Sequence, residues 1–369
     1  MLDTYDIGSL PLRVEEKAIY EGAKESGSLL SLVGVADDSV RIFEEEVLTA
    51  FIDKLSAGLT VPNYPQFRDM NEMFFDLLRG IEKIEAGYVA LKTITARPGA
   101  TIPEVDVIRE NSSRIRDIAG IEKTNVKVCV TGPYTLASFF QRKSAKLFED
   151  LGQALADVVS RTVFSSKYSE VTLVCIDEPV IGFLNDPLLD YGSDGREALR
   201  GAWEEICRAA SSKGASTSIH LHDTSDDMFW EVEHLDLIQA HIVDPIYSQE
   251  ATKRQLKETG KRLKASIFAT QFDNLITNSL KREGFEGDLQ QRVGDIWTQI
   301  GRKEIDPMAF LEGIDVGVKR LSDVVERFGA ENVPMAGPEC GLGSWPSYET
   351  AMECLRRTAE AVKVFSGEN

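Results

Sequence analysis

Short runs of β-branched and aliphatic residues alternate with longer stretches of helical periodicity along the chain. Candidate strands lie at residues 4–9, 58–62, 86–95, 126–132, 170–177, 215–222, 236–244, 263–270 and 332–338. Such runs are typical of parallel strands that are buried on both faces. The run at 86–95 continues through Arg97-Pro98-Gly99-Ala100 towards Ile102 and Val105, which favours a hairpin outside the main sheet. Leaving it out of the nine runs gives eight, the number of strands in a (β/α)8 barrel.

Helical stretches fill the intervals between these runs. They lie at residues 38–56, 70–85, 144–167, 195–213, 275–300, 306–328 and 347–364. The last begins after Ser347, a favourable N-cap residue, and carries Ala351, Leu355 and Ala359 at i, i+4 spacing. No proline- or serine-rich linker and no internal repeat divides the sequence. We therefore expect an α/β fold with one domain over residues 1–369, a (β/α)8 TIM barrel with N-terminal and hairpin embellishments. Active sites of such barrels form at the carboxyl ends of the strands.

Charge and hydropathy restrict the partners and the location. The 41 Lys and Arg against 60 Asp and Glu give a net charge of −19, which repels nucleic acid and anionic membranes. No apolar run approaches the roughly 20 residues that span a bilayer, and the N-terminus lacks the features of a signal peptide. We expect a cytoplasmic protein without nucleic-acid or membrane partners. The five Cys are too scattered for a disulfide framework, and Cys129 and Cys175 lie in apolar runs that predict buried thiols.

All four histidines lie within one short stretch of the chain. His220 and His222 end a predicted strand, and residues at i and i+2 of a strand point to the same face. His241 ends the next run, so three imidazoles could converge at the barrel mouth. His234 follows a polar segment that is typical of a solvated helix end.

A cysteine follows the last predicted strand. Cys340 lies in a loop flanked by glycine, where the backbone can approach closely. Three histidines and one thiolate suit zinc, which accepts both donor types in tetrahedral geometry. A histidine at a strand end is more often a hydrogen-bonded structural residue, but the clustering of His220, His222, His241 and Cys340 favours a metal site.

Other strand ends are also polar. The carboxylates of Asp177 and Glu178 alternate in direction, so only one should point into the barrel, either to hold a cation or to cap a helix. Residues 7–9 offer backbone N–H groups and a hydroxyl that could bind a carboxylate, and residues 67–73 resemble an ordinary polar loop. The sequence contains no GxGxxG, Walker A or GxSxG motif, which argues against nucleotide binding and serine hydrolysis.

Taken in order, these strand-end motifs resemble the catalytic half of cobalamin-independent methionine synthase. The motifs are Ile7-Gly8-Ser9-Leu10-Pro11, Arg68-Asp69-Met70-Asn71-Glu72-Met73-Phe74, Thr131-Gly132-Pro133, Ile176-Asp177-Glu178-Pro179, His220-Leu221-His222 and Pro338-Glu339-Cys340-Gly341-Leu342. The resemblance implies a barrel of the uroporphyrinogen decarboxylase and methionine synthase type. It implies a zinc-dependent methyl transfer to homocysteine that forms methionine.

The resemblance also assigns roles to individual residues. His220 and Cys340 match zinc ligands of the family. Ser9, with Ile7 and Gly8, would hold the homocysteine carboxylate. Glu72 and Asp177 would hold its ammonium group.

Two positions depart from the family pattern. His222 stands where the family has a Cys, and His241 stands where it has a Glu, with Asp244 as the alternative if the register is shifted. The net charge of Zn²⁺ with one thiolate and neutral imidazoles is +1, whereas the net charge of Zn²⁺ with two thiolates and one carboxylate is −1. A more positive metal lowers the pKa of a bound thiol further but makes its thiolate a poorer nucleophile. We therefore expect a more reactive methyl donor or a metal other than zinc.

The methyl donor is a separate question. The full-length family enzyme has an additional N-terminal barrel that helps to bind folate, and a chain of 369 residues has no room for one. A methylated corrinoid protein is therefore the leading candidate donor.

Three other functions remain open. Related short enzymes alkylate another thiol such as coenzyme M, but its sulfonate gives Glu72 and Asp177 no ammonium group to hold. Metal-dependent hydrolases of the amidohydrolase type also use His-X-His, but on the first strand, whereas here the pair falls on about the sixth. A non-catalytic accessory protein could keep the barrel and the metal and pass methyl groups to a partner.

Overall fold

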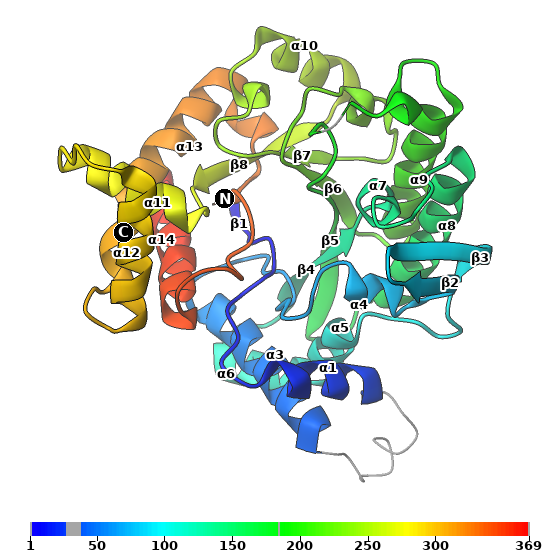
Figure 1. Cartoon of the computed structure of the whole chain (residues 1–369), viewed down its shortest axis with the longest axis horizontal. Coiled ribbons are helices and arrows are strands. Elements are labelled where there is room, and N and C mark those ends of the chain that lie inside the picture. The colour runs from blue at the N-terminus through cyan, green and yellow to red at the C-terminus, as the bar shows by residue number, and fades with distance from the viewer. Residues whose placement is uncertain (1, 27–37, 184, 368–369) are drawn as a thin grey trace.

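A curled sheet of seven strands forms the centre of the molecule (Figure 1). The structure is a computed structural model that describes residues 2–26, 38–183 and 185–367. The strands pair in parallel in the order β1-β9-β8-β7-β6-β5-β4. Their bounds are β1 (Asp3–Thr4), β4 (Thr124–Thr131), β5 (Ser169–Glu178), β6 (Ser216–Leu221), β7 (Leu237–Gln239), β8 (Arg262–Phe268) and β9 (Met335–Pro338).

Residues 61–63 take the remaining strand position, between β1 and β4. Val61 forms a parallel bridge with Tyr5, and Asn63 forms one with Lys127. The Val61 N–H donates to the Thr4 carbonyl at 2.9 Å. Pro62 has no N–H group, so this segment cannot form a regular ladder. The predicted barrel is thus confirmed, with a second strand that is reduced to single bridges.

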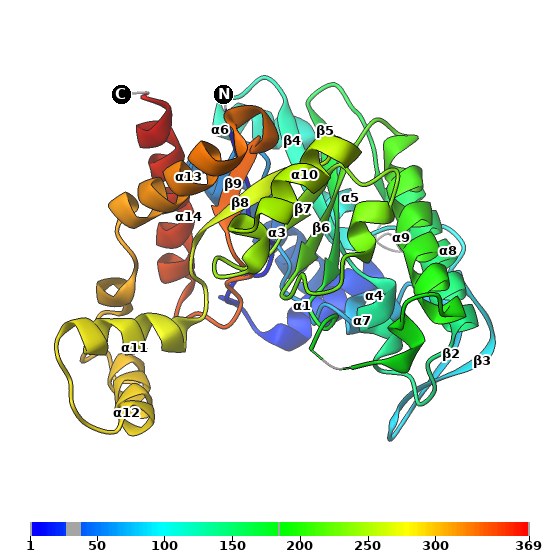
Figure 2. The same cartoon turned by 90° about the horizontal axis from the view of Figure 1, so that it is seen from above.

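Helices surround the sheet (Figure 2). Those that pack around it are α3 (Asp38–Ser56), α8 (Ala145–Thr162), α9 (Asp194–Ser211), α10 (Glu250–Thr259), α13 (Ile314–Phe328) and α14 (Tyr348–Ser366). Serine side chains cap three of them: Ser144, Ser193 and Ser347 each accept a hydrogen bond from the backbone N–H three residues later. The predicted helix start at Ser347 is confirmed. Within the described ranges, no helix combines the length and apolar character needed to cross a membrane.

The predicted helix at 70–85 is wrong. This stretch holds a single helical turn, α4 (Glu72–Phe75), followed by strand β2 (Leu78–Ile84), which pairs antiparallel with β3 (Gly87–Ala96). Ile81 and Ile84 lie at a helical spacing, but Gly80 has φ +91°, which an L residue rarely adopts, and the pairing register shifts there.

The hairpin outside the barrel is confirmed, but its predicted partner is wrong. The strand at 86–95 pairs with the segment before it, β2, and not with the segment that follows. Ile102 caps helix α5 (Pro103–Glu110), which contains Val105. The helix starts there because Pro103 occupies its first turn, where a missing N–H costs nothing.

Two other predicted helices are interrupted. The stretch 275–300 is divided into α11 (Phe272–Arg282) and α12 (Leu289–Gly301), with Gly284 at φ +73° between them. Both helices project away from the barrel (Figures 1 and 2). The stretch 306–328 begins with the short 3-10 helix η4 (Pro307–Phe310), and α13 follows Gly313. The smaller helices are α1 (Glu16–Glu25), α6 (Ser112–Ala119) and α7 (Pro133–Ala137).

Candidate metal centre

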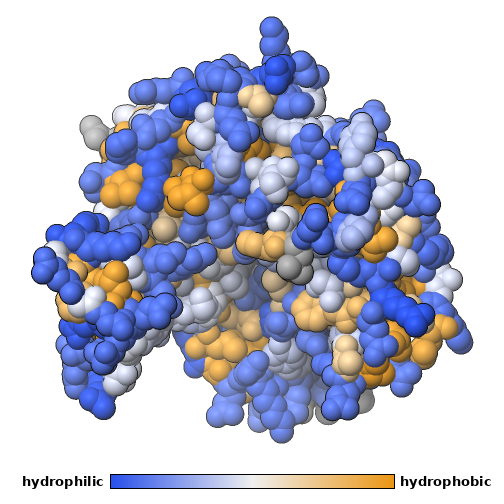
Figure 3. Space-filling view, turned by 45° about the horizontal axis from the view of Figure 1, so that its top comes forward, coloured by the Kyte–Doolittle hydropathy of each residue, from blue (hydrophilic) through white to orange (hydrophobic). Residues whose placement is uncertain are grey.

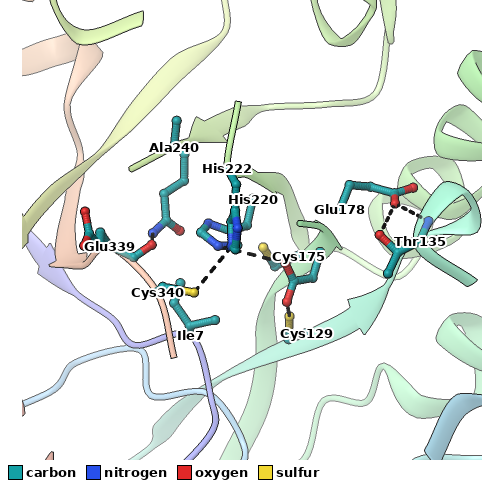
Figure 4. A network of polar contacts seen from close by, with 12 residues as sticks. Ile7, Cys129, Thr135, Cys175, Glu178, His220, His222, Ala240, Glu339 and Cys340 are labelled. Carbon is teal, nitrogen blue, oxygen red and sulfur yellow. Dashed lines mark hydrogen bonds and ion pairs between the residues drawn. The ribbon is translucent and has the colours of Figure 1, made fainter. Parts of the chain in front are cut away.

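Four side chains with metal-binding atoms converge at the carboxyl ends of β6, β7 and β9, and three of them, His220, His222 and Cys340, are labelled in Figure 4. His220 lies in β6, and His222 follows it at the same face. His241 lies two residues after β7, and Cys340 lies two residues after β9. Their ligand atoms all lie within 4.8 Å of one another, and Cys340 Sγ is 3.5 Å from His222 Nε2. The structure thus brings together the four residues that the sequence singled out.

The imidazoles present unpaired nitrogens to one another. The ring centroids of His222 and His241 are 4.1 Å apart, and those of His222 and His220 are 5.3 Å apart. Both ring nitrogens of His220 and Nε2 of His241 are buried without a hydrogen-bond partner among the described residues. An unsatisfied buried polar atom costs about 1–3 kcal/mol. Coordination of one metal ion would satisfy one nitrogen of each ring.

Burial sets the protonation states of the group. It lowers the pKa of His222 to about 4, with a further contribution from His241, and it lowers that of His220 well below its ordinary value. The imidazoles are therefore neutral, as metal ligands must be. Burial, together with the Asp177 charge, raises the pKa of Cys340 to about 12. A cation is therefore needed to ionise this thiol, and a donor set of three imidazoles and one thiolate fits zinc.

Asp244, the alternative ligand to His241, forms hydrogen bonds with other parts of the chain. Its carboxylate accepts hydrogen bonds from the backbone N–H of Thr224 at 3.1 Å, from the Thr224 hydroxyl and from the backbone N–H of Ile246 at 2.8 Å. Asp244 therefore fixes the loops beside the site and does not join the four-residue group. His234 lies apart from that group and pairs with Glu204.

The adjacent carboxylates Asp177 and Glu178 lie in different surroundings: Asp177 lies beside His220, whereas Glu178 contacts Thr135 (Figure 4 labels Glu178 and Thr135). Asp177 is the register partner of His220, and its Oδ1 lies 4.0 Å from His220 Nε2. That oxygen has no hydrogen-bond partner in the described part of the chain, and burial raises the pKa of Asp177 to about 8. Of the pair, Asp177 is therefore the carboxyl group beside the candidate metal ligands, and a cation next to it would favour its ionised form.

Glu178 faces the surrounding helices instead. Its carboxylate accepts hydrogen bonds from the backbone N–H groups of Tyr134 and Thr135, from the Thr135 hydroxyl and from Trp203 Nε1, all at 2.7–2.9 Å. These four donors satisfy it fully. Glu178 therefore joins β5 to α7 and α9 and has a structural role.

The segment predicted to bind a carboxylate lies against the loop that carries Cys340. Ser9 Oγ accepts a hydrogen bond from the Gly343 N–H at 3.2 Å, and the Ser9 carbonyl accepts one from the Leu342 N–H at 3.1 Å. A Cβ atom on Gly341 would lie 2.1 Å from Ser9 Oγ and would displace this hydroxyl from its position. Gly8, at φ +140°, and the buried Ile7 precede Ser9. The segment after β1 thus meets the loop after β9 beside the metal ligands.

Glu72 is engaged by the hairpin. Its Oε1 accepts a hydrogen bond from Lys83 Nζ at 2.7 Å, and its Oε2 accepts one from the Tyr88 hydroxyl at 2.8 Å. Its side chain is partly exposed. The structure therefore assigns contacts to both of its oxygens and does not bring it into the four-residue group.

Sequence reasoning missed several residues near the site. Phe183 is 60% exposed, and its ring lies edge-on to His222 with centroids 6.1 Å apart. Val243, two residues after His241, is 91% exposed. Figure 3 shows that apolar residues interrupt a mostly hydrophilic surface on one face of the molecule. Lys127 and Lys264 are fully buried in the barrel, although a lysine in a strand usually indicates a solvent-facing position. In the sequence, the apolar run around each lysine is the only feature that indicates its burial.

The predicted buried thiols are confirmed. Cys129 and Cys175 are register partners on β4 and β5, and both are free and buried. Cys129 Sγ lies 3.8 Å from Asp177 Oδ2, directly below the mouth.

Comparisons with known proteins identify the family of this chain. The family described as cobalamin-independent synthase, catalytic domain, matches residues 2–264. This match includes the three histidines, whereas Cys340 is placed by the structure alone. A methionine synthase from Sulfolobus acidocaldarius is 24% identical over 210 residues, which cover 55% of this chain and 57% of that protein. One from Sulfurisphaera tokodaii is 26% identical over 151 residues, which cover 39% and 44%. The chain thus spans about half the length of these curated relatives.

A solved structure shares the fold. It is that of a B12-independent methionine synthase from Shewanella sp. W3-18-1 in complex with selenomethionine. Its TM-score is 0.61 at 13% sequence identity, and the alignment covers 100% of this chain and 98% of that one. Because the family match covers well over half of the sequence, the resemblance of the strand-end motifs is confirmed: the chain belongs to the family of cobalamin-independent synthase catalytic domains.

Proposed function

We propose that this protein transfers a methyl group to the thiol of homocysteine and so forms methionine. One observation carries the proposal: three histidines and a cysteine place their ligand atoms within 4.8 Å of one another at the barrel mouth. The family supports it, since the matching curated relatives are both described as methionine synthases.

The metal that we propose is zinc, held by His220, His222, His241 and Cys340. When bound, zinc would lower the pKa of the substrate thiol and so supply a thiolate near neutral pH. The chain contributes neutral imidazoles, which remain neutral because burial lowers their pKa values. His222 and His241 replace a thiolate and a carboxylate of the family pattern, so the chain's own ligands carry less negative charge.

The amino-acid end of homocysteine would be held on the two sides of this group. Asp177 would offer the ammonium a carboxylate oxygen that has no hydrogen-bond partner in the described part of the chain and lies 4.0 Å from His220 Nε2. Ser9, Ile7 and Gly8 lie next to the Cys340 loop and would bind the carboxylate. Glu72 would have to share its carboxylate with Lys83 and Tyr88, so we expect its contribution to be smaller.

The transfer itself needs alignment. A sulfur lone pair of homocysteine forms the new S–CH₃ bond while the bond between the methyl group and its carrier breaks, and that bonding pair stays with the carrier. Barrel residues that fix both ends of homocysteine hold its sulfur in line with the methyl carbon, which reduces the entropic cost of the reaction. The residues proposed here position the substrate, and none donates or accepts a proton in this step.

The donor that we propose is a methylated corrinoid protein. The more positive ligand set makes a weaker nucleophile, and a corrinoid-bound methyl group is a reactive donor. The test is to incubate the zinc-loaded enzyme and homocysteine with methylcob(III)alamin and, separately, with 5-methyltetrahydrofolate, and to measure methionine. We expect methionine with the first donor only. Methionine from the folate alone would contradict the donor assignment. Transfer to coenzyme M but not to homocysteine would contradict the acceptor and favour the other thiol alkyltransferases.

Two expectations remain predictions. A single domain over residues 1–369 is supported by the contact of Ser9 with Gly343, which joins segments from opposite ends of the sequence. The cytoplasmic location can be checked by fractionating cells that express the tagged chain.

A further inference from the structure

We propose that Glu339 is a positioning residue that ties the segment of His241 to the segment of Cys340 and so sets the geometry of the metal centre. The inference rests on the proposed metal site and names a residue that supports it without belonging to the ligand set. Glu339 directly precedes Cys340 and is 7% exposed (Figure 4).

The carboxylate of Glu339 joins three loops at the barrel mouth. Its Oε2 accepts a hydrogen bond at 3.0 Å from the backbone N–H of Ile242, the residue after His241. Its Oε1 accepts one at 3.1 Å from the backbone N–H of Thr270, in the loop after β8. Each carboxylate oxygen therefore accepts a hydrogen bond from a backbone N–H group. Both N–H groups stay satisfied only if an acceptor atom stands opposite each of them.

A second link runs in the opposite direction. Gln239 ends β7, two residues before His241, and its Nε2 donates to the carbonyls of Pro338 at 3.2 Å and of Glu339 at 3.4 Å. Gln239 is also the register partner of His220. Gln239, near His241, therefore binds the backbone of the Cys340 segment, and Glu339, next to Cys340, binds the backbone of the His241 segment.

These links matter because regular strand pairing does not reach the two ligands. Strand β7 has three residues and pairs with β8 only at Leu237 and Ile238. Strand β9 ends at Pro338, two residues before Cys340. Backbone hydrogen bonds hold the Cys340 segment to Phe268 and to Ser9, and the side chains of Glu339 and Gln239 link it to the His241 segment. Loss of such outer-shell support typically weakens metal affinity about 10–100-fold.

The test measures metal binding directly. Metal-free wild-type protein and Glu339→Gln are titrated with Co²⁺ under anaerobic conditions, and the visible d–d and thiolate-to-metal bands are recorded. Zn²⁺ competition then gives the dissociation constant. The Gln variant keeps the side-chain volume but places an NH₂ group opposite one of two backbone N–H donors. We expect a dissociation constant about 10–100-fold higher and an altered Co²⁺ spectrum.

Glu178→Gln is the matched control. Glu178 is another buried carboxylate that accepts from two backbone N–H groups, but it faces the helices. We expect it to lower the Tm and to leave the Co²⁺ affinity and spectrum unchanged. If Glu339→Gln does not fold, Gln239→Met removes the opposite link and should also weaken Co²⁺ binding.

The outcomes separate the inference from the proposed function. Unchanged Co²⁺ affinity and spectrum in folded Glu339→Gln, or in Gln239→Met where that variant is needed, would overturn the positioning role while leaving the metal centre intact. An equal loss in Glu178→Gln would show a general effect of destabilisation and would also overturn it. If the wild-type chain bound no Co²⁺, the metal centre itself would be wrong.

Discussion

The mouth of the barrel and the layer beneath it both contain buried polar side chains. Those in the lower layer are hydrogen-bonded, whereas several atoms at the mouth have no hydrogen-bond partner. Beneath the mouth, Lys54 Nζ lies 2.6 Å from Asp6 Oδ2 and donates to the carbonyls of Gly8 and Asn63. Lys127 Nζ also donates to carbonyls of this layer. At the mouth, both ring nitrogens of His220 and Oδ1 of Asp177 lack a hydrogen-bond partner among the residues that the structure describes, and His220 Nε2 and Asp177 Oδ1 lie 4.0 Å apart.

This difference separates buried polar groups that support the fold from buried polar groups that can bind a ligand. A buried charge is tolerated when it is paired and hydrogen-bonded, as Lys54 is, and such a group supports the fold. Unsatisfied atoms cost stability, and here they gather where a metal ion and an ammonium group would satisfy them. The lower layer therefore stabilises the barrel, while the mouth offers unsatisfied polar atoms to a ligand.

The largest effect on function is expected at the mouth. Cys340→Ala removes the one thiolate of the ligand set, so metal binding and methyl transfer should be lost together. Metal content is measured by elemental analysis and activity by methionine formation. Cys207→Ala, at a buried free thiol in α9, should keep both. Full metal content in Cys340→Ala would show that the ligand assignment is wrong.

The largest effect on stability is expected in the lower layer. Lys54→Met leaves Asp6 as a buried carboxylate without its cation, which costs about 3–5 kcal/mol. Urea unfolding of the metal-free protein measures the change. The double variant Lys54→Met/Asp6→Asn should recover part of the loss, because it removes the charge as well. A loss below about 1 kcal/mol in Lys54→Met would contradict the paired state of this layer.

Asp177→Asn is expected to have a smaller effect that is confined to substrate binding. It removes the charge offered to the ammonium, so the Kd for homocysteine should rise about 10–100-fold at unchanged metal content. Glu72→Gln should raise it less, since Lys83 and Tyr88 already engage that carboxylate. Binding of 4-mercaptobutanoate, which lacks the ammonium, should not change in either variant. An equal loss of affinity for both thiols would exclude ammonium binding by Asp177.

The smallest effect concerns the pH dependence of stability. Lys264 is fully buried, with Nζ 3.5 Å from Ser218 Oγ and 4.1 Å from the ring centroid of Tyr5, and burial lowers its pKa to about 8. Between about pH 8 and its unfolded pKa of about 10.4, the unfolded chain binds the extra proton, so this lysine makes stability rise with pH.

The check compares unfolding free energies at pH 7.5 and pH 9.5. The stability gained by Lys264→Met over wild type should shrink as the pH rises. Lys127→Met is the control, because nearby thiols help to raise the pKa of Lys127 despite its burial, so it should show no such trend in this window. The same trend in both variants would contradict the assignment to Lys264.

Local patterns predicted those features that depend on local geometry. His220 and His222 share a face because strand residues alternate, and the order of strands brings His241 and Cys340 beside them. The predicted hairpin partner is wrong because Ile81 and Ile84 lie at a helical spacing, whereas the turn at residues 85–86 depends on the pairing of β2 with β3. The link through Glu339 joins loops about 70–100 residues apart, so no local pattern indicates it.

The most direct test of the central claim counts the protons released when homocysteine binds. Metal-loaded protein is titrated calorimetrically in two buffers of different ionisation enthalpy, with coenzyme M as the comparison. A divalent cation at the four ligands keeps Asp177 ionised, so the proton counted comes from the thiol. The account predicts homocysteine binding with about one proton released, and weaker binding of coenzyme M. No homocysteine binding by the metal-loaded protein, with or without binding of coenzyme M, would contradict it.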